Sequence, residues 1–448
     1  MNILIKNGRI IDPSQDIDGI GEILVKDGKI QEINLVQKRG SAEVQKKKAS
    51  ALRISKPSDL QTIDASGCIV IPGLVDLHTH LREPGYEYKE TIMTGTKAAV
   101  RGGFTSVCCM PNTNPVNDTI AVTEFIIEKA MKEGFCHVYP IGTITKGQKN
   151  EELAELEALN RSGCVAFSDD GKPVTNSLLM RRALEYSKIF GIPIISHCED
   201  QYLFEGGVMN EGFVSTILGL KGIPKAAEEI MVARDIALCE LTGGKLHIAH
   251  VSCEGSVRLI RDAKSRGLNV TAETCPHYFS ITDESLLNYD TNFKVNPPVR
   301  TQKDVEAIKE GLKDCTIDVI ATDHAPHHID DKNREFDTAA FGISGLETAF
   351  SLGLQLVGQG IFDLNQLIAA MTIIPSRIIN IPKGALLSGS EADIAIINTE
   401  KEFIVDSSRF LSKGKNSPFN RWTLKGTVEK TISMGKVHDW SEESGLYK

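Results

Sequence analysis

Two histidines that lie two residues apart, His78 and His80, form the pattern with the clearest chemical meaning. They follow the apolar run from Cys68 to Leu77. Because side chains alternate between the two faces of a β-strand, both imidazoles point to the same side at the strand end. Such a pair is half of a metal site, and Arg82, one step further along the same face, indicates an anionic substrate.

More histidines and aspartates stand where other apolar runs end: Asp169 and Asp170, His197, His250 and Asp323. Four histidines and two carboxylates, with one of the adjacent Asp169 and Asp170 counted, exceed the ligands of one catalytic zinc ion, which usually takes about three protein ligands and a water. We therefore predict two metal ions with a bridging group. The dominance of imidazole over oxygen ligands favours zinc.

Strand-like runs alternate with helical patterns along most of the chain. Strands are predicted at 74–78, 104–110, 137–142, 164–168, 193–197, 245–250, 269–274 and 317–322, and helices at 120–132, 151–161, 177–190, 226–241, 256–266 and 301–312. Eight strands, each followed by a helix or a long loop, favour a closed (β/α)8 barrel (TIM-like, class α/β) over one open sheet. The active site of such a barrel lies at the carboxyl ends of its strands, so the histidines and aspartates converge on one rim.

Short strands and turns at both ends of the chain predict a second, smaller β domain. Asp27-Gly28 between two apolar runs is a strong hairpin signal, and strands return at 393–397, 403–405 and 427–434. We predict a catalytic barrel over residues 73–383 and a discontinuous β domain from 1–72 and 384–448. The lysine- and arginine-rich segment 37–60 is predicted to be a solvated insertion.

The composition excludes several function classes. A net charge of −9 over 448 residues argues against a general nucleic-acid binder. No apolar run is long enough to span a membrane, and the amino terminus does not resemble a signal peptide. Ten cysteines without a CxxC pair favour reduced thiols. We expect a cytoplasmic protein that acts on a small molecule and binds neither nucleic acid nor membrane.

The chain resembles the amidohydrolase superfamily and, within it, the dihydroorotases of the bacterial type I branch. The resemblance covers nearly the whole chain in the family's order, and it is carried by these motifs: His78-Thr-His80-Leu-Arg82-Glu-Pro-Gly85, Met110-Pro-Asn112-Thr-Asn-Pro115, Phe167-Ser-Asp-Asp170-Gly171, His197-Cys-Glu-Asp200, Ile248-Ala-His250-Val-Ser252, Glu273-Thr-Cys-Pro-His277-Tyr278, Asn296-Pro-Pro-Val-Arg300, Thr322-Asp323-His-Ala-Pro-His327 and Phe341-Gly342-Ile-Ser-Gly345-Leu-Glu347-Thr348.

The resemblance implies roles for the matching residues. One zinc ion would be held by His78, His80 and Asp323, and a second by His197 and His250, with Asp170 rather than Asp169 shared between them. Asp323 would also be the catalytic proton carrier. The implied substrate contacts are His80, Arg82, Asn112, Asn296, His327, Phe341 and Gly342. Ala340 stands where the family usually has proline.

The implied activity is the reversible cyclisation of N-carbamoyl-L-aspartate to L-dihydroorotate, the third step of pyrimidine (UMP) biosynthesis, by a metal-activated bridging hydroxide. The resemblance also implies a homodimer that can associate with aspartate transcarbamoylase. One alternative is another cyclic amidase, a hydantoinase or allantoinase. Those enzymes place a carboxylated lysine at the end of the fourth barrel strand, but the fourth predicted strand of this chain, 164–168, does not end in a lysine. The other alternative is a non-catalytic scaffold partner of aspartate transcarbamoylase, which would be expected to have lost metal ligands.

Three other histidines near the predicted strand ends are interpreted separately. His247 is expected to point away from His250, toward the outer helices, because of strand alternation. His277 is interpreted equally as a support for the metal ligands or as a packing residue. His324 either orients Asp323 or makes a loop hydrogen bond.

Overall fold

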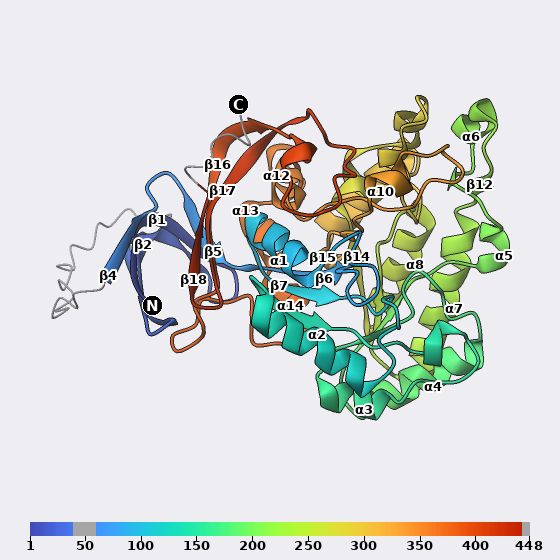
Figure 1. The fold of residues 1–448 in the computed structure, drawn as a ribbon, viewed down its shortest axis with the longest axis horizontal. Helices are drawn as coiled ribbons and strands as arrows, with labels where there is room; N and C mark the ends of the chain where they lie inside the picture. Colours follow the sequence, from blue (N-terminus) through green and yellow to red (C-terminus); the bar gives the residue numbers. More distant parts are fainter. Residues whose placement is uncertain (39–59, 441–448) are drawn as a thin grey trace.

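The computed structural model describes residues 1–38 and 60–440. Within these ranges, eight parallel strands surround one axis: β6 (Leu74–Thr79), β7 (Phe104–Cys109), β8 (His137–Pro140), β9 (Phe167–Ser168), β10 (Ile194–Ser196), β13 (Leu246–Ile248), β14 (Val270–Thr274) and β15 (Val319–Ile320). They form two sheets, β6-β7-β8 and β9-β10-β13-β14-β15, which bridges from Gly142 to Phe167 and from Thr79 to His324 close into a barrel (Figure 1). The predicted (β/α)8 fold is confirmed.

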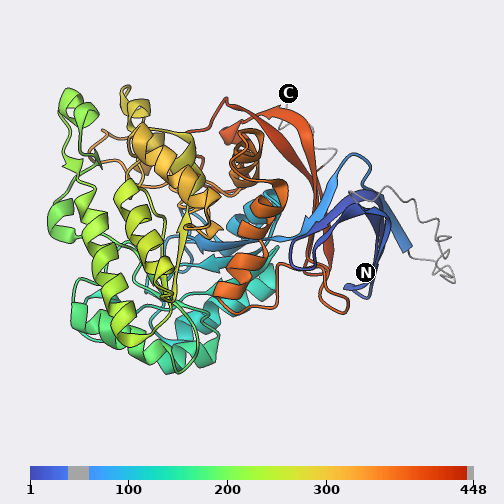
Figure 2. The ribbon, with the colours of Figure 1, turned by 180° about the vertical axis from the view of Figure 1, so that it is seen from behind.

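Helices cover the outside of the barrel (Figure 2). Those between consecutive barrel strands are α1 (Ile92–Arg101), α2 (Ile120–Glu133), α3 (Leu156–Ser162), α4 (Ser177–Ser187), α7 (Ala226–Thr242), α8 (Glu254–Ser265), α9 (Pro276–Ser280) and α10 (Gln302–Lys313). After β15 follow α11 (Ile329–Lys332), α12 (Ala349–Gly358), α13 (Leu364–Ala370) and α14 (Ile373–Ile378). An excursion between β10 and α7 contains α5 (Gln201–Phe204), β11 (Met209–Asn210), α6 (Phe213–Leu218) and β12 (Gly222–Ile223).

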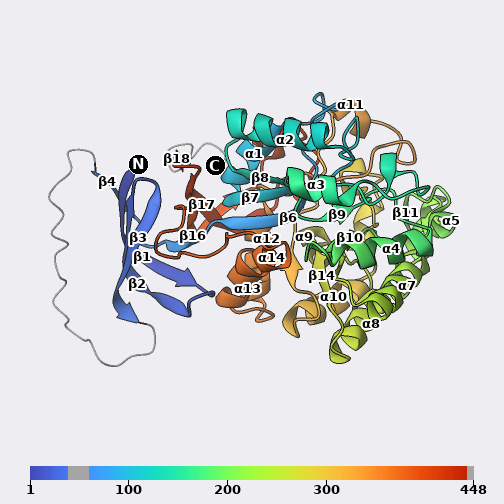
Figure 3. The same ribbon diagram turned by 90° about the horizontal axis from the view of Figure 1, so that it is seen from below.

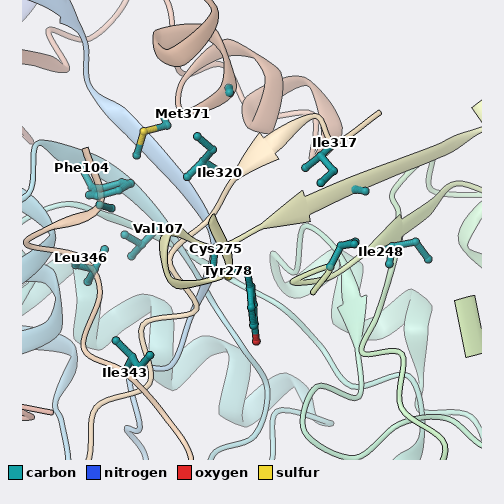
Figure 4. Packing of buried hydrophobic residues seen from close by; sticks show 14 of the residues in the cluster. Phe104, Val107, Ile248, Cys275, Tyr278, Ile317, Ile320, Ile343, Leu346 and Met371 are labelled. Atoms are coloured by element: carbon teal, nitrogen blue, oxygen red, sulfur yellow. The ribbon is translucent and has the colours of Figure 1, made fainter. Parts of the chain in front are cut away.

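Alternation along the short barrel strands divides the core into two layers. Ile194, Leu246 and Ile248 belong to the large apolar cluster between the barrel and its helices, part of which is drawn in Figure 4. Ile195 follows Ile194 in β10 and therefore faces the opposite way. It belongs, with Val319, to a smaller cluster inside the barrel. A parallel barrel is buried on both faces, so apolar residues occupy both faces of its strands, and buried polar residues such as Asp76, His78 and Glu273 interrupt them.

Strands from both ends of the chain form one further sheet (Figure 3). Its order is β18 (Lys436–Asp439), β17 (Thr423–Ser433), β16 (Ile394–Ile404), β5 (Ile69–Pro72), β1 (Asn2–Asp12), β2 (Ile17–Lys26) and β3 (Lys29–Lys38), and β4 (Leu60–Asp64) pairs with β1. Lys26 pairs with Lys29 across Asp27 and Gly28, whose φ angles of 52° and 77° confirm the predicted two-residue hairpin.

Three predictions concern the molecule outside the barrel. The basic segment lies outside the described residues, apart from its ends at 37, 38 and 60. All ten cysteines are free thiols, as expected. Within residues 1–38 and 60–440, no helix combines the length and the apolar character that crossing a membrane requires.

Candidate active site

The two histidines of the first motif meet an aspartate from the last barrel strand. His80 lies just beyond β6, and its Nε2 is 3.1 Å from Oδ1 of Asp323. Nε2 of His78 is 3.5 Å from the same oxygen. All three side chains are buried, and one ligand atom from each lies within 4.8 Å of the others. The bridge that closes the barrel between Thr79 and His324 brings these two strand ends together.

Asp170 lies between this group and the remaining histidines. Its Oδ2 is 3.4 Å from Nε2 of His80, whereas its Oδ1 is 3.4 Å from both Nε2 of His78 and Nδ1 of His197. Oδ1 is also 3.5 Å from Nε2 of His250, which lies 2.7 Å from Nδ1 of His197. The geometry groups His78 with Asp170 and His250 as a second candidate metal set, and His197 adjoins it.

Unpartnered polar atoms show that the cluster fits a metal. In the described part of the chain, four buried atoms of these residues have no hydrogen-bond partner: Nε2 of His78, Oδ1 of Asp170, Nε2 of His197 and Nδ1 of His250. A buried polar atom without a partner costs about 1–3 kcal/mol. A cation bound in the cluster would satisfy Nε2 of His78 and Oδ1 of Asp170, the two of these atoms that face each other there, and imidazole with carboxylate is a donor set that zinc prefers.

The electrostatics favour a divalent cation as well. Burial alone raises the pKa of Asp170, but the surrounding imidazoles, His78 above all, lower it well below its ordinary value. The pKa of Asp323 is lowered in the same way, against the effect of burial. Burial lowers the pKa of His197, but Asp170 and Glu199 raise it to about 10. Both carboxylates are thus anionic at neutral pH, and they supply negative charge at the cluster.

Backbone strain lies at two of the ligand positions. His250 has a φ of 34° and Asp323 a φ of 45°, both in the left-handed region that residues other than glycine seldom adopt. His250 lies two residues beyond the end of β13 and Asp323 three residues beyond the end of β15, so the loop and not strand alternation aims each side chain. Strained residues of this kind cluster at functional sites, where the surrounding structure holds them in place.

A carboxylate that had no predicted role, Glu273 of β14, holds the first ligand. Its Oε1 is 2.6 Å from Nδ1 of His78, and its Oε2 is 3.2 Å from Nε2 of His247, whose Nδ1 lies 2.8 Å from the hydroxyl of Thr271. An ionised carboxylate only accepts hydrogen bonds, so Nδ1 of His78 donates to Glu273, and Nε2 is the nitrogen that faces the cluster. Glu273 stands one residue before the end of a barrel strand, and this position in the sequence indicates a residue near the active-site rim.

The prediction that His247 faces the outer helices is wrong. His247 is fully buried and contacts Glu273. It pairs in register with Ile195, which faces the barrel interior. Strand β13 ends at Ile248, so alternation does not extend to His250, and the two histidines can both point inward.

The other two histidines have different surroundings. His324 does not contact Asp323 through its ring: its Nδ1 accepts a hydrogen bond from the Gly345 amide at 3.2 Å, and its Nε2 lies 3.6 Å from Glu90. Of the two interpretations of His324, the structure therefore supports the loop hydrogen bond. His277 packs edge-on against Tyr278, and burial lowers its pKa to about 4.

The predicted substrate residues surround one cavity of about 270 Å³ beside the cluster. Its lining comprises His80, Arg82, Asn112, Asn296, His327, Phe341 and Gly342, together with Asp170, Gly171, His197, His250, Val295, Asp323 and Ala325. His78 lies beneath this surface. Val295 and Ala325 are apolar residues of the lining that had not been predicted. Val295 directly precedes Asn296 in the sequence, and Ala325 directly follows His324.

Two cations, Arg82 and Lys89, keep His327 neutral at the wall of this cavity. Nζ of Lys89 lies 3.2 Å from its Nδ1, so Nδ1 accepts, and Nε2 donates to the carbonyl of Phe341 at 2.7 Å. Burial, followed by the charges of Arg82 and Lys89, lowers the pKa of His327 well below its ordinary value. A neutral imidazole thus lies 3.3 Å from the Arg82 guanidinium, which keeps its positive charge free for an anion.

Asn112 connects the cavity to the metal ligands. Its Oδ1 is 2.8 Å from Nδ1 of His80, and its Nδ2 donates to Oδ2 of Asp170 at 3.4 Å. Asn296 donates to Glu199 at 3.3 Å, whereas its buried Oδ1 has no partner within the described residues. Both amides are held by neighbours and still face the cavity, as ligand-orienting groups require.

Comparison with known proteins assigns the chain to a family. A family model described as "Dihydro-orotase-like" matches residues 67–256. A dihydroorotase of Geobacter metallireducens (strain ATCC 53774 / DSM 7210 / GS-15) is 56% identical over 98% of this chain and 99% of its own length. The chain belongs to the dihydroorotase family. A dihydroorotase of Syntrophus aciditrophicus (strain SB) is 53% identical over the same shares of the two chains.

Solved structures share the architecture at lower identity. The L-hydantoinase (dihydropyrimidinase) from Arthrobacter aurescens superposes with a TM-score of 0.83 over 97% of this chain and 95% of its own, at 25% identity. A dihydropyrimidinase from Brevibacillus agri NCHU1002 gives a TM-score of 0.81 at 23% identity. The barrel and the terminal sheet are therefore common to cyclic amidases beyond the dihydroorotase family. The candidate metal groups described above are in keeping with a metal-dependent family.

Proposed function

We infer that this chain is a dihydroorotase, a cyclic amide hydrolase of pyrimidine biosynthesis. It closes N-carbamoyl-L-aspartate to L-dihydroorotate with loss of water and opens the ring by the reverse reaction. One observation carries the inference beyond the family: the Arg82 guanidinium lines the same cavity as the histidine–aspartate cluster. Dihydroorotate offers a cyclic amide to that cluster and a carboxylate to that cation.

Arg82 discriminates between this substrate and neutral rings. A guanidinium binds a carboxylate through two parallel hydrogen bonds, and the substrate keeps its carboxylate in both directions of the reaction. Hydantoin and allantoin have no such carboxylate and would leave Arg82 unpaired, which is costly at a partly buried site. We propose that Asn112 and His327 complete the carboxylate site, and that Asn296 and the backbone of Phe341 and Gly342 hold the ring.

We propose two zinc ions in the cluster. His78, His80 and Asp323 would hold one, and His197 and His250 the other. Asp170 would be shared, since its two oxygens face different imidazoles. When bound, zinc polarises the amide carbonyl and lowers the pKa of a water to about 7.

Asp323 is the proposed proton carrier. It lies at the cluster and on the wall of the cavity at the same time. In hydrolysis it would accept a proton from the attacking water and give it to the departing ring nitrogen, and in cyclisation the proton would travel the opposite way.

The test is a parallel assay of three substrates combined with a metal analysis. We expect hydrolysis of L-dihydroorotate at least a hundredfold faster than hydrolysis of hydantoin or allantoin, and close to two zinc ions per chain. Chelation should abolish turnover, and zinc should restore it. Faster turnover of hydantoin would favour the cyclic-amidase alternative, and absence of both metal and turnover would favour the non-catalytic scaffold.

We further propose a cytoplasmic homodimer that can associate with aspartate transcarbamoylase. We also propose the division into a barrel at 73–383 and a β domain at 1–72 and 384–448, which the pairing of β5 with β16 supports. Light scattering on the purified chain, alone and with aspartate transcarbamoylase, tests the assembly. A monomer that leaves the second protein unbound would contradict it.

A further inference from the structure

Two lysines are buried beside the substrate cavity. Lys294 and Lys332 are only 1% and 2% exposed, and they are among the largest fully buried side chains of the described residues. Burial lowers the pKa of Lys294 to about 8 and that of Lys332 to about 7. Ammonium groups are costly to bury unless every donor has a partner, so their contacts indicate what they are for.

Lys294 holds the start of the loop that follows α11. Its Nζ donates to the carbonyls of Phe336 at 2.7 Å and Asp337 at 2.9 Å. The same ammonium lies 4.4 Å from the centre of the Phe341 ring, within the range of a cation–π contact. One side chain thus contacts both ends of the segment from 336 to 341.

Lys332 holds the end of the same loop. Its Nζ lies 2.8 Å from the carbonyl of Ala340, 3.2 Å from that of Gly342 and 3.3 Å from that of Lys294. An ammonium group has three donors, and here each one has a carbonyl. The Gly342 amide donates to the Lys294 carbonyl at 2.9 Å, so the two lysines and the loop form one connected network.

This network ends at the substrate cavity. Phe341 and Gly342 line it, and the Phe341 carbonyl accepts from His327. Gly342 has a φ of 145°, and a β-carbon there would lie 2.5 Å from the Ala325 carbonyl, so the backbone is tightly confined. Ala340, where the family usually has proline, donates its amide to the Asp331 carbonyl at 3.0 Å, a bond that proline could not make.

We propose that Lys294 and Lys332 are positioning residues for the substrate: they fix the backbone of Phe341 and Gly342 at the distance from the metal cluster that the ring requires. This inference rests on the proposed function, because it assigns the loop to ring binding. It predicts that the two lysines determine the affinity for the substrate and leave the chemistry of the cluster intact.

The test compares methionine substitutions at the two buried lysines and at Lys383, which is partly buried. K294M and K332M keep most of the side-chain volume and remove the donors. K383M is the matched control, because Nζ of Lys383 also has three polar partners, namely His137 at 3.0 Å, Glu391 at 2.5 Å and Asp393 at 2.7 Å. His137 begins β8 at its amino-terminal end, opposite the rim that carries the active site, and Glu391 and Asp393 contact it there.

We expect K294M and K332M to raise KM for dihydroorotate about tenfold or more, with kcat within about threefold and the zinc content unchanged. K383M should lower the melting temperature and leave KM unchanged. The double variant K294M/K332M should raise KM less than the product of the single effects, because both lysines act on one loop. Values of KM within twofold of wild type in both folded single variants would overturn the proposal.

A second readout does not depend on turnover. Chymotrypsin cleaves after phenylalanine. Phe336 and Phe341 lie in the loop 336–342, and we call its attachment by Lys294 and Lys332 the clamp. Well below the melting temperature, cleavage there should be at least about tenfold faster in K294M and K332M than in wild type or K383M, because it follows local opening. Unchanged cleavage would refute the clamp. If the wild type does not hydrolyse dihydroorotate but the cleavage difference is seen, the proposed function fails while the clamp remains.

Discussion

Glu273 decides which nitrogen of His78 faces the metal cluster, although it is not itself a candidate ligand. It accepts from His78 at 2.6 Å and from His247 at 3.2 Å, so one carboxylate orders two imidazoles. Burial opposes its ionisation, but His78 lowers the pKa of Glu273 below its ordinary value, and the carboxylate stays charged. The first ligand is therefore oriented from β14, on a different part of the barrel.

Replacing Glu273 by glutamine should weaken metal binding. The amide can accept only one of the two bonds, so His78 loses its fixed tautomer. We expect zinc affinity to fall about 10–100-fold, measured by titration in a metal buffer, and turnover to recover when excess zinc is added. T271V is the control, since the Thr271 hydroxyl contacts only His247 in this chain of bonds. A full zinc affinity in E273Q would remove Glu273 from the metal site.

Arg82→Ala should affect substrate binding more than chemistry. Loss of a bidentate pair with the substrate carboxylate raises KM about 10–100-fold, equivalent to about 1.5–3 kcal/mol. The zinc content should not change, because Arg82 contacts His327 and Pro326 but none of the candidate ligands. An unchanged KM for dihydroorotate would contradict the assignment of Arg82 to the carboxylate.

At the scale of elements, periodicity predicts the barrel well. Each of the eight predicted strands has a counterpart, and helices such as α2 and α10 begin and end within two residues of their predicted positions. The predicted strands 164–168 and 317–322 shorten to β9 (Phe167–Ser168) and β15 (Val319–Ile320), because only these residues of each run pair in register with the adjacent strand, β10 or β14. Helix α1 was not predicted, since Thr94, Gly95 and Thr96 are poor helix formers and packing stabilises it.

The segment before α12 carries a pH-sensitive contact. Glu347 accepts from the amides of Leu411 at 2.7 Å and Ser412 at 3.2 Å, in the connection between β16 and β17. Burial raises its pKa to about 7, above the value of about 4.3 expected in the unfolded chain. Between these two values the folded state holds the extra proton, so this group stabilises the fold at low pH and the contribution is lost as the pH rises to 7.

E347Q should remove that dependence on pH. Glutamine can accept the same two amide hydrogens but does not ionise. We expect E347Q and wild type to melt at similar temperatures at pH 5, and the variant to be more stable at pH 8 by on the order of 1–2 kcal/mol. Calorimetry at both pH values measures this difference. An equal difference at pH 5 and pH 8 would rule out titration of Glu347 as its cause.

At the scale of the whole molecule, the connection between β16 and β17 completes the wall of the active-site cavity. Asn416 accepts from the amide of His327 at 3.0 Å, and its Nδ2 donates to Gly342 at 2.9 Å and Ala325 at 3.1 Å. One buried amide thus ties three residues of the cavity wall to the terminal sheet. The sequence does not reveal this link, because no periodicity relates residue 416 to residues that lie 74 to 91 positions earlier.

Asn416→Ala should therefore impair catalysis as well as stability. The variant leaves several buried groups without partners, and we expect a loss of about 2–4 kcal/mol of unfolding free energy. A decrease of at least tenfold in kcat/KM should accompany it. The control is N398A on β16, where the side chain caps only the local amides of Glu400 and Lys401. A normal kcat/KM in folded N416A would show that the contact is purely structural.

The pairing of β5 with β16 has a consequence for synthesis of the chain. Ile71 pairs with Ala395, so one edge of β5 has no strand to pair with until the ribosome has passed residue 394. All the candidate metal ligands have emerged by then, since the last of them is Asp323. An unpaired strand edge is a site of aggregation, and nascent proteins expose such edges while they wait for distant partners. A chain that stops before residue 394 would thus carry all the candidate ligands together with an unpaired edge of β5, and we expect it to aggregate.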